Sequence, residues 1–311
     1  MSSLAGARRK GEASLLAVSK WQGLGNDYLI IEETVLPGSL TREAIALLCD
    51  RHRGVGSDGI LLHCSPTGGV PEAVARMRVF NPDGSEAEMC GNGIRMFARY
   101  LVERGIVTAP EFVVETLAGP VAPRILPDGL VRVDMGQARF RSSSIAWEGE
   151  GDVVNAALEA GGHRYEFTFV DVGNPHCVIL VDDIKRVDVA SLGPAIERHP
   201  LFPQRVNVEF VHPESDGSVS MRVWERGAGE TQACGTGATA VGVACVHLGV
   251  AHSPVTVHLL GGDLLIEANG GEARSGVAPG SGCLYQVFMT GPAEKVFEAT
   301  LAPDLLRRLG W

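Results

Sequence analysis

The chain has 311 residues, 45% of them hydrophobic, and a formal net charge of −10 at pH 7. This length can form two hydrophobic cores of ordinary size, and the acidic balance argues against a nucleic-acid partner. The sequence contains no apolar run long enough to cross a membrane, and the apolar stretch near the N-terminus is too short for the core of a signal peptide. We therefore expect a cytoplasmic protein with no membrane or nucleic-acid partner, in which residues 1–15 are an extension.

Short strands dominate the predicted secondary structure, and turns such as Pro127-Asp128-Gly129 separate them. In chain order we predict a helix at 42–50, a strand at 77–80, a helix at 94–104, strands at 112–115, 130–135, 165–172, 177–181, 207–212 and 221–224, a helix at 238–248, and strands at 255–260, 264–267 and 284–289. Helix 238–248 has almost no polar face, so we expect it to be enclosed on all sides. We interpret the segment 142–162 as an exposed excursion.

An internal repeat divides the chain. Residues 77–106 and 221–250 align without a gap at an offset of 144, and a second repeat relates Gly25-Asn26 to Gly173-Asn174 at an offset of 148. Two copies with so long a period indicate a duplicated domain with a site between the copies, not a solenoid. We therefore predict an α+β fold of two pseudo-symmetric barrel-like domains, each with strands around a central helix. The N-terminal half would be 16–133 plus 291–304, and the C-terminal half 134–290.

The chain contains seven cysteines, an odd number that argues against a secreted disulfide framework. No Cys-x-x-Cys motif occurs and no cysteine has zinc-finger spacing to a histidine, so we predict no metal site. Cys49, Cys245 and Cys283 are interpreted as small buried hydrophobic residues. Cys90 and Cys234 differ, because each begins a Cys-Gly-x-Gly motif at the same position of the repeat.

Each of these two cysteines stands where a predicted helix begins. The free N–H groups and partial positive charge of a helix N-terminus should lower the thiol pKa and can also bind a carboxylate. One carboxylate held between two such ends would have a thiol on either side of its α-carbon. That geometry suits removal of the α-proton on one face and protonation on the other. None of the four lysines lies in a repeated motif, so we expect no pyridoxal phosphate.

With these residues assembled, the chain resembles the diaminopimelate epimerase family over nearly its whole length. The resemblance lies in residues 22–28, 51–59, 80–85, 90–93, 115–119, 173–177, 205–207, 224–231 and 233–237. It implies a pair of similar α/β barrels, each around a central helix, and a homodimer. It also implies interconversion of LL- and meso-diaminopimelate without cofactor or metal, in lysine and peptidoglycan precursor biosynthesis.

The resemblance also assigns roles to individual residues. Cys90 and Cys234 would be the two acid/base groups, with His176 beside Cys90 and Glu225 beside Cys234. The backbone pairs Gly91-Asn92 and Gly235-Thr236 would hold the reacting carboxylate. The substrate pocket would be lined by Asn26, Asn81, Asn174, Asn207, Glu225 and Arg226. The planar fork of Arg226 suits a distal carboxylate, and asparagines suit a closed polar pocket because each offers a donor and an acceptor. One departure is Gly59, where some members have Gln, so that a side-chain contact would be absent.

Two other functions fit the same residues. A related racemase, of the proline or histidine kind, would also use paired cysteines on a duplicated fold, and a panel of substrates would separate it. A non-catalytic binding module would not need a thiol in both halves. Selective alkylation of Cys90 or Cys234 by a reactive substrate analogue would exclude that reading.

Overall fold

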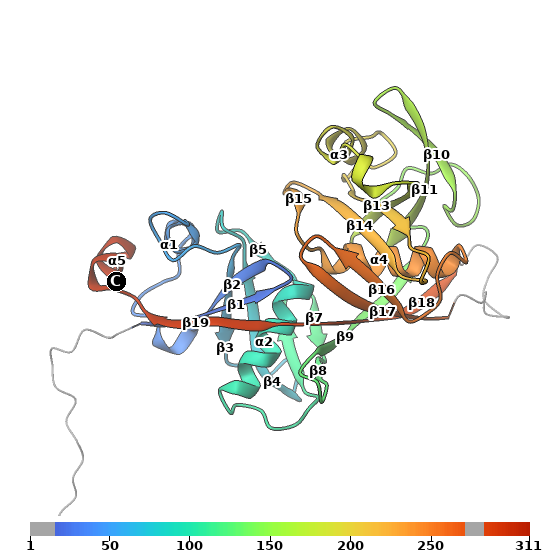
Figure 1. The fold of residues 1–311 in the computed structure, drawn as a ribbon. Helices are drawn as coiled ribbons and strands as arrows, with labels where there is room; N and C mark the ends of the chain where they lie inside the picture. The colour runs from blue at the N-terminus through green and yellow to red at the C-terminus, as the bar shows by residue number, and fades with distance from the viewer. Residues whose placement is uncertain (1–15, 271–282) are drawn as a thin grey trace, which may run out of the picture.

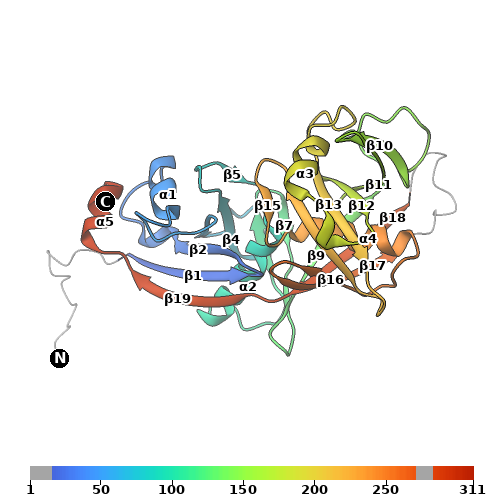
Figure 2. The ribbon, with the colours of Figure 1, turned by 45° about the horizontal axis from the view of Figure 1, so that its top comes forward.

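A computed structural model describes residues 16–270 and 283–311, and Figure 1 shows two lobes, each built from a sheet and a central helix. The predicted extension, residues 1–15, lies outside the described residues. The chain returns from the C-terminal lobe to the N-terminal lobe between β18 (Leu284–Gly291) and β19 (Glu294–Thr300), so it crosses between the lobes twice (Figure 2). In the described ranges, none of the helices is long and apolar enough to cross a membrane.

The N-terminal lobe contains an eight-stranded sheet that packs on helix α2 (Gly91–Glu103). Ile94, Phe97 and Leu101 of α2 have no exposed surface, as their helical spacing predicts. The strand order is β19-β1-β2-β3-β4-β6-β7, with β5 paired to β4. The elements are β1 (Ala17–Gly23), β2 (Asn26–Glu32), α1 (Arg42–Cys49), β3 (Ile60–Cys64), β4 (Ala73–Phe80), β5 (Glu86–Ala87), β6 (Val113–Thr116), β7 (Gly119–Val121), β19 (Glu294–Thr300) and α5 (Pro303–Leu309).

The C-terminal lobe contains an eleven-stranded sheet in the order β10-β11-β12-β13-β14-β16-β17-β18-β9-β8, with β15 paired to β14. An additional pairing between β11 and β9 closes this sheet around α4 (Gly235–His247). The other elements are β8 (Arg124–Ile125), β9 (Val131–Arg139), β10 (Ala156–Ala160), β11 (His163–Asp171), β12 (Pro175–Leu180), α3 (Val189–Glu197), β13 (Asn207–Pro213), β14 (Val219–Glu225), β15 (Gly229–Thr231), β16 (Val255–Leu259), β17 (Gly262–Gly270) and β18 (Leu284–Gly291).

The predicted class, an α+β fold of two barrel-like units with a helix in each, is confirmed. Helix α4 is enclosed, as its lack of a polar face predicts, and Gly242 lies directly against Ile266 of β17. Strand pairings place 124–139 with the C-terminal sheet, so the boundary drawn at residues 133 and 134 falls inside β9. Helices α3 and α5 were not predicted.

The segment 142–162 is not an exposed excursion, and that prediction was wrong. Its last residues form β10, which pairs with β11 from Ala156 to Ala160. Ile145, Val153 and Leu158 are buried in a second hydrophobic core of the C-terminal lobe. The alternation in β10 depends largely on alanines, whose small side chains give a weak strand signal even when they face a core.

Candidate active site at two helix N-termini

The two central helices meet at their N-terminal ends. A Cβ placed on Gly91 would lie 3.8 Å from the Cα of Gly235, and one placed on Gly235 would lie 3.6 Å from the Cα of Gly91. The Met289 side chain fills the space beside both glycines. Because neither residue carries a side chain, the two backbones approach closely where the two helices begin, and the first turns of both helices have N–H groups without partners inside the helix.

Cys90 and Cys234 are the N-cap residues of these helices. Both have extended backbone conformations, and each thiol accepts the N–H of the residue three positions on, Gly93 at 3.3 Å and Gly237 at 3.4 Å. This capping is why α2 and α4 begin at Gly91 and Gly235, three residues before the predicted starts. The placement of both thiols at helix N-termini therefore agrees with the expectation from the sequence.

The expected lowering of the thiol pKa does not hold at either cysteine. Burial raises the pKa of Cys90, although hydrogen bonds from Gly93 and Tyr28 oppose the increase. Burial raises the pKa of Cys234 well above its ordinary value, and the nearby carboxylates of Glu225 and Glu209 raise it further. Desolvation of the charged form therefore outweighs the helix N-terminus at both thiols. The two thiols also differ, because Glu225 and Glu209 both raise the pKa of Cys234, whereas Glu225 is the acidic group among the main causes at Cys90.

A chain of buried and half-buried polar groups leads to Cys234. Glu209 Oε1 lies 2.6 Å from Nδ1 of His176, and Nε2 of His176 lies 3.0 Å from Oδ1 of Asn174. The Asn174 amide donates to Thr236 Oγ1 at 3.3 Å, and that hydroxyl lies 3.5 Å from the Cys234 sulfur. His176 and Glu209 have no exposed surface. The structure thus connects four predicted site residues, His176, Asn174, Thr236 and Cys234, with Glu209, which was not predicted.

The N-terminal half has a different set of contacts. The Cys90 sulfur lies 3.7 Å from the hydroxyl oxygen of Tyr28. The Asn92 amide donates to Asn26 Oδ1 at 3.1 Å and to the carbonyl of Ala233 in the other half at 3.4 Å. Arg95 is fully buried and donates to Asn92 Oδ1 at 2.9 Å. Asn92 therefore links the two halves directly beside the two thiols.

The remaining predicted residues are less closely grouped. Asn207 is buried, donates to the carbonyl of Pro175 at 3.2 Å and accepts the backbone N–H of Arg226 at 2.9 Å. Glu225 accepts the Thr231 hydroxyl at 2.5 Å. The guanidinium of Arg226 is exposed and donates to the Gln204 carbonyl at 3.1 Å. Asn81 donates to Ser85 within a turn at 2.9 Å.

Gly59 has no room for the glutamine found in some relatives. A Cβ at this position would lie 2.5 Å from the ring of Tyr28. The Tyr28 ring and the Phe80 carbonyl crowd this position, and the hydroxyl of Tyr28 lies beside Cys90. The repeat contains the signal for this role, because Tyr28 and His176 stand at the offset of 148 that relates the two Gly-Asn pairs.

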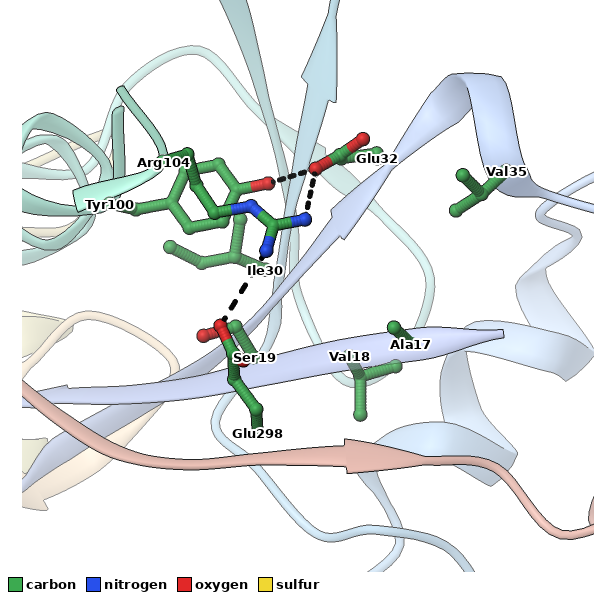
Figure 3. A pocket seen from close by; sticks show the side chains of 9 residues that line it. All are labelled: Ala17, Val18, Ser19, Ile30, Glu32, Val35, Tyr100, Arg104 and Glu298. Carbon is green, nitrogen blue, oxygen red and sulfur yellow. Dashed lines mark hydrogen bonds and ion pairs between the residues drawn. The ribbon is translucent and has the colours of Figure 1, made fainter. Parts of the chain in front are cut away.

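A separate cavity of about 100 Å³ lies at the other end of α2 (Figure 3). Its polar groups are paired with one another: Glu32 accepts the Tyr100 hydroxyl at 2.7 Å and the Arg104 guanidinium at 2.9 Å. Arg104 also pairs with Glu298 across the cavity. Within residues 16–270 and 283–311, no group of three or more His, Cys, Asp or Glu side chains is arranged to hold a metal ion.

Comparisons with known proteins agree with this geometry. The sequence model of the family described as diaminopimelate epimerase matches residues 18–141 and 168–296. The diaminopimelate epimerase of Pelotomaculum thermopropionicum is 49% identical over 287 residues, 90% of this chain and 96% of the relative. That of Desulfitobacterium hafniense is 46% identical over 94% of this chain and 100% of the relative.

Solved structures show the same fold at much lower identity. A probable proline racemase from Agrobacterium radiobacter superposes with a TM-score of 0.66 at 19% identity, over 93% of each chain. A hydroxyproline epimerase from Agrobacterium vitis has a TM-score of 0.66 at 18% identity, over 94% of each chain. These structures support the fold prediction, and at such identity they carry no information on the substrate.

Proposed function

Because the chain belongs to the diaminopimelate epimerase family, we propose that it interconverts LL- and meso-diaminopimelate without a cofactor, as an isomerase of lysine and peptidoglycan precursor biosynthesis. The observation that supports this most strongly is the meeting of α2 and α4, each capped by a cysteine. A single carbon held at this junction would have one thiol on each face.

The proposed reaction begins with removal of the α-proton by one thiolate. The opposite thiol then donates its proton to the other face of the carbon, which inverts the centre and leaves the proton on the first cysteine. The backbone N–H groups of Gly91-Asn92 and Gly235-Thr236 would hold the carboxylate and stabilise the charge that develops on it. Entry of the carboxylate would also displace water, so both thiols would react in a dry and preorganised environment.

The other predicted site residues would select the substrate and assist proton movement. We propose that Asn26, Asn174 and Asn207 bind the polar groups of the substrate and that Arg226 binds its distal carboxylate. Asn207 is already bonded to the backbone of Arg226, which supports a shared role. The Arg226 guanidinium would exchange its contact with the Gln204 carbonyl for the substrate carboxylate, a stronger charge-assisted partner. Asn81 and Glu225 would complete this set, and His176 would assist proton transfer.

Exchange of the α-proton in heavy water tests this function. Purified protein and LL-diaminopimelate, without added cofactor, should yield meso-diaminopimelate with deuterium at the inverted carbon. Variants Cys90→Ala and Cys234→Ala are the controls and should show no inversion. Exchange with proline or histidine, and none with diaminopimelate, would instead assign the chain to the racemase alternative.

We also propose that the protein is a cytoplasmic homodimer. Edge strand β19 exposes Val296 and Phe297, with 51% and 38% of their surfaces accessible, which supports a contact between copies at this edge. Light scattering after gel filtration would give the mass in solution. A dimer that persists in a Val296→Lys, Phe297→Lys double variant would place the contact elsewhere.

A further inference from the structure

Glu209 and His176 form a fully buried pair that the proposed reaction does not yet use. Glu209 Oε1 and His176 Nδ1 are 2.6 Å apart, and both side chains have no exposed surface. Two lone pairs repel at this separation, so one proton must lie between the two atoms. Among the described residues, Glu209 Oε2 has no hydrogen-bond partner, and burial raises the pKa of this carboxyl.

The hydrogen bonds on the other side of the imidazole lead to the same conclusion. When the Asn174 amide nitrogen donates to Thr236, the Asn174 amide oxygen accepts Nε2–H of His176. The proton at Nδ1 of His176 is then shared with Glu209. With the amide reversed, Nε2 accepts and Nδ1 must carry the imidazole proton. Either orientation places a proton in the Glu209–His176 contact.

The internal repeat shows that only one half has such a pair. Tyr28 and Leu61 occupy the positions of His176 and Glu209, since β2 pairs with β3 in the register in which β12 pairs with β13. A Cβ on Gly93 would lie 3.0 Å from Leu61, and a Cβ on Gly237 would lie 3.0 Å from Glu209 Oε1. The fold therefore needs no ionisable group at this place, and Leu is sufficient for packing in the other half.

We propose that Glu209 is a positioning residue of the two-thiol site, which holds an exchangeable proton against Nδ1 of His176 and so fixes the hydrogen bonds that reach the Cys234 thiol. This inference rests on the proposed epimerase function. The path is Glu209 to His176, then Asn174 and Thr236, then Cys234. When the reaction removes the proton from Cys234, the hydroxyl of Thr236 can change from acceptor to donor toward the sulfur. The Glu209–His176 pair meanwhile keeps the hydrogen bonds through Asn174 to Thr236 in place.

Several titratable groups face this path. Cys177 and His176 come from β12, Glu209 from β13, Glu225 from β14 and Cys234 from the start of α4. Both carboxyls raise the pKa of Cys234. Removing the acid at position 209 should therefore lower the pH at which Cys234 forms a thiolate. Cys90, whose main neighbours are Gly93, Tyr28, Asn92 and Glu225, should not change.

The test compares Glu209→Gln with Glu209→Leu. Gln keeps the shape and one hydrogen bond but cannot give or take a proton, whereas Leu copies the residue of the other half. Steady-state kinetics gives kcat and KM for epimerisation by each variant. Alkylation with iodoacetamide followed by peptide mapping gives a pH profile for Cys234 and for Cys90. The Tm of each variant is also measured. For Glu209→Gln we expect kcat to fall by about 10²-fold or more with little change in KM. The Cys234 profile should move to lower pH while the Cys90 profile and Tm stay the same.

The outcomes separate the possible roles of Glu209. Wild-type kcat and Cys234 profile in Glu209→Gln would overturn the proposal, because rescue by the isosteric amide means a structural hydrogen bond. Equal changes at both cysteines together with a lower Tm would also overturn it. If wild-type protein does not epimerise diaminopimelate, the proposed function fails, and the alkylation profiles still decide whether Glu209 acts on Cys234.

Discussion

The hydroxyl oxygen of Tyr28 lies 3.7 Å from the sulfur of Cys90, and it is the side-chain partner of that thiol in the structure. The nearby Cys90 thiolate charge and burial hold the pKa of Tyr28 well above its usual value, so the phenol keeps its proton. It can therefore donate to the sulfur whenever Cys90 is a thiolate. The hydrogen bonds of His176, which the resemblance places beside Cys90, go to Glu209 and Asn174.

Tyr28→Phe should slow the reaction at Cys90. Loss of the hydroxyl removes a hydrogen bond that lowers the pKa of this thiol, so the pKa rises further and less thiolate forms near neutral pH. We expect kcat/KM to fall about tenfold at pH 7, as for loss of one hydrogen bond to a charged group, and to recover partly at higher pH. The matched control is Tyr100→Phe, because Tyr100 donates to Glu32 at the far end of the same helix. Similar losses in both variants would assign the effect to helix packing.

How much of this site the sequence predicts depends on the repeat. The Cys-Gly-x-Gly motifs locate both thiols because a helix start is a local feature, set by a cap and two glycines. The thiol pKa values are not predictable in this way, since burial depends on strands distant in sequence. Glu209 was not predicted for the same reason. It acts on the site only because parallel pairing places β13 beside β12, which a reading along the sequence does not show.

Gly242→Ala should destabilise the C-terminal lobe although alanine favours helices. A Cβ at this position would lie 2.5 Å from Cγ2 of Ile266, so helix and strand must move apart. Overpacking of this kind costs about 1–3 kcal/mol in the free energy of unfolding, which exceeds the gain of about 1 kcal/mol in helix propensity. Chemical denaturation measures the change. Combination with Ile266→Ala should show a favourable coupling energy, and strictly additive effects would mean that the close contact is relieved elsewhere.

Arg226→Lys should weaken substrate binding without affecting the fold. The side chain is exposed, and the backbone bond to Asn207 survives the substitution. An ammonium cannot reproduce the planar fork, so we expect a loss of about 2–3 kcal/mol in binding, seen mainly as a higher KM. Steady-state kinetics with LL-diaminopimelate, with Tm as the control, checks this. Wild-type kcat/KM would show that another group binds the distal carboxylate.

Oxidation should inactivate the enzyme reversibly by joining Cys90 to Cys234. The two N-cap residues flank a junction so narrow that a Cβ added to Gly91 or to Gly235 would lie 3.8 or 3.6 Å from the Cα of the other, and we expect closure of the site to bring the two sulfurs together. Activity lost in a mild oxidant should return in reductant. Peptide mapping of the inactive sample should show this disulfide, and finding both cysteines reduced there would disprove the explanation. Substrate should protect, because in the proposed complex the bound carbon would lie between the thiols.

The final prediction concerns the division of labour between the two thiols. If each faces one side of the α-carbon, each is the base for one stereoisomer and the acid for the other. Cys90→Ser and Cys234→Ser should each nearly abolish epimerisation, because a serine hydroxyl has too high a pKa to act as base near neutral pH.

Each single variant keeps one thiol, and elimination of HX from a 3-halogenated substrate analogue needs a base on one face only. We therefore expect both variants to retain elimination, with opposite preference for the configuration at the α-carbon. The reactions are measured with both isomers of the analogue and both variants, and the double variant supplies the background. The neighbours of the two thiols differ, with Tyr28 at Cys90 and Thr236 at Cys234, so the two elimination rates should also differ in pH dependence. Elimination from the same isomer by both variants, or epimerisation at the wild-type rate by either, would show that the two cysteines do not act on opposite faces.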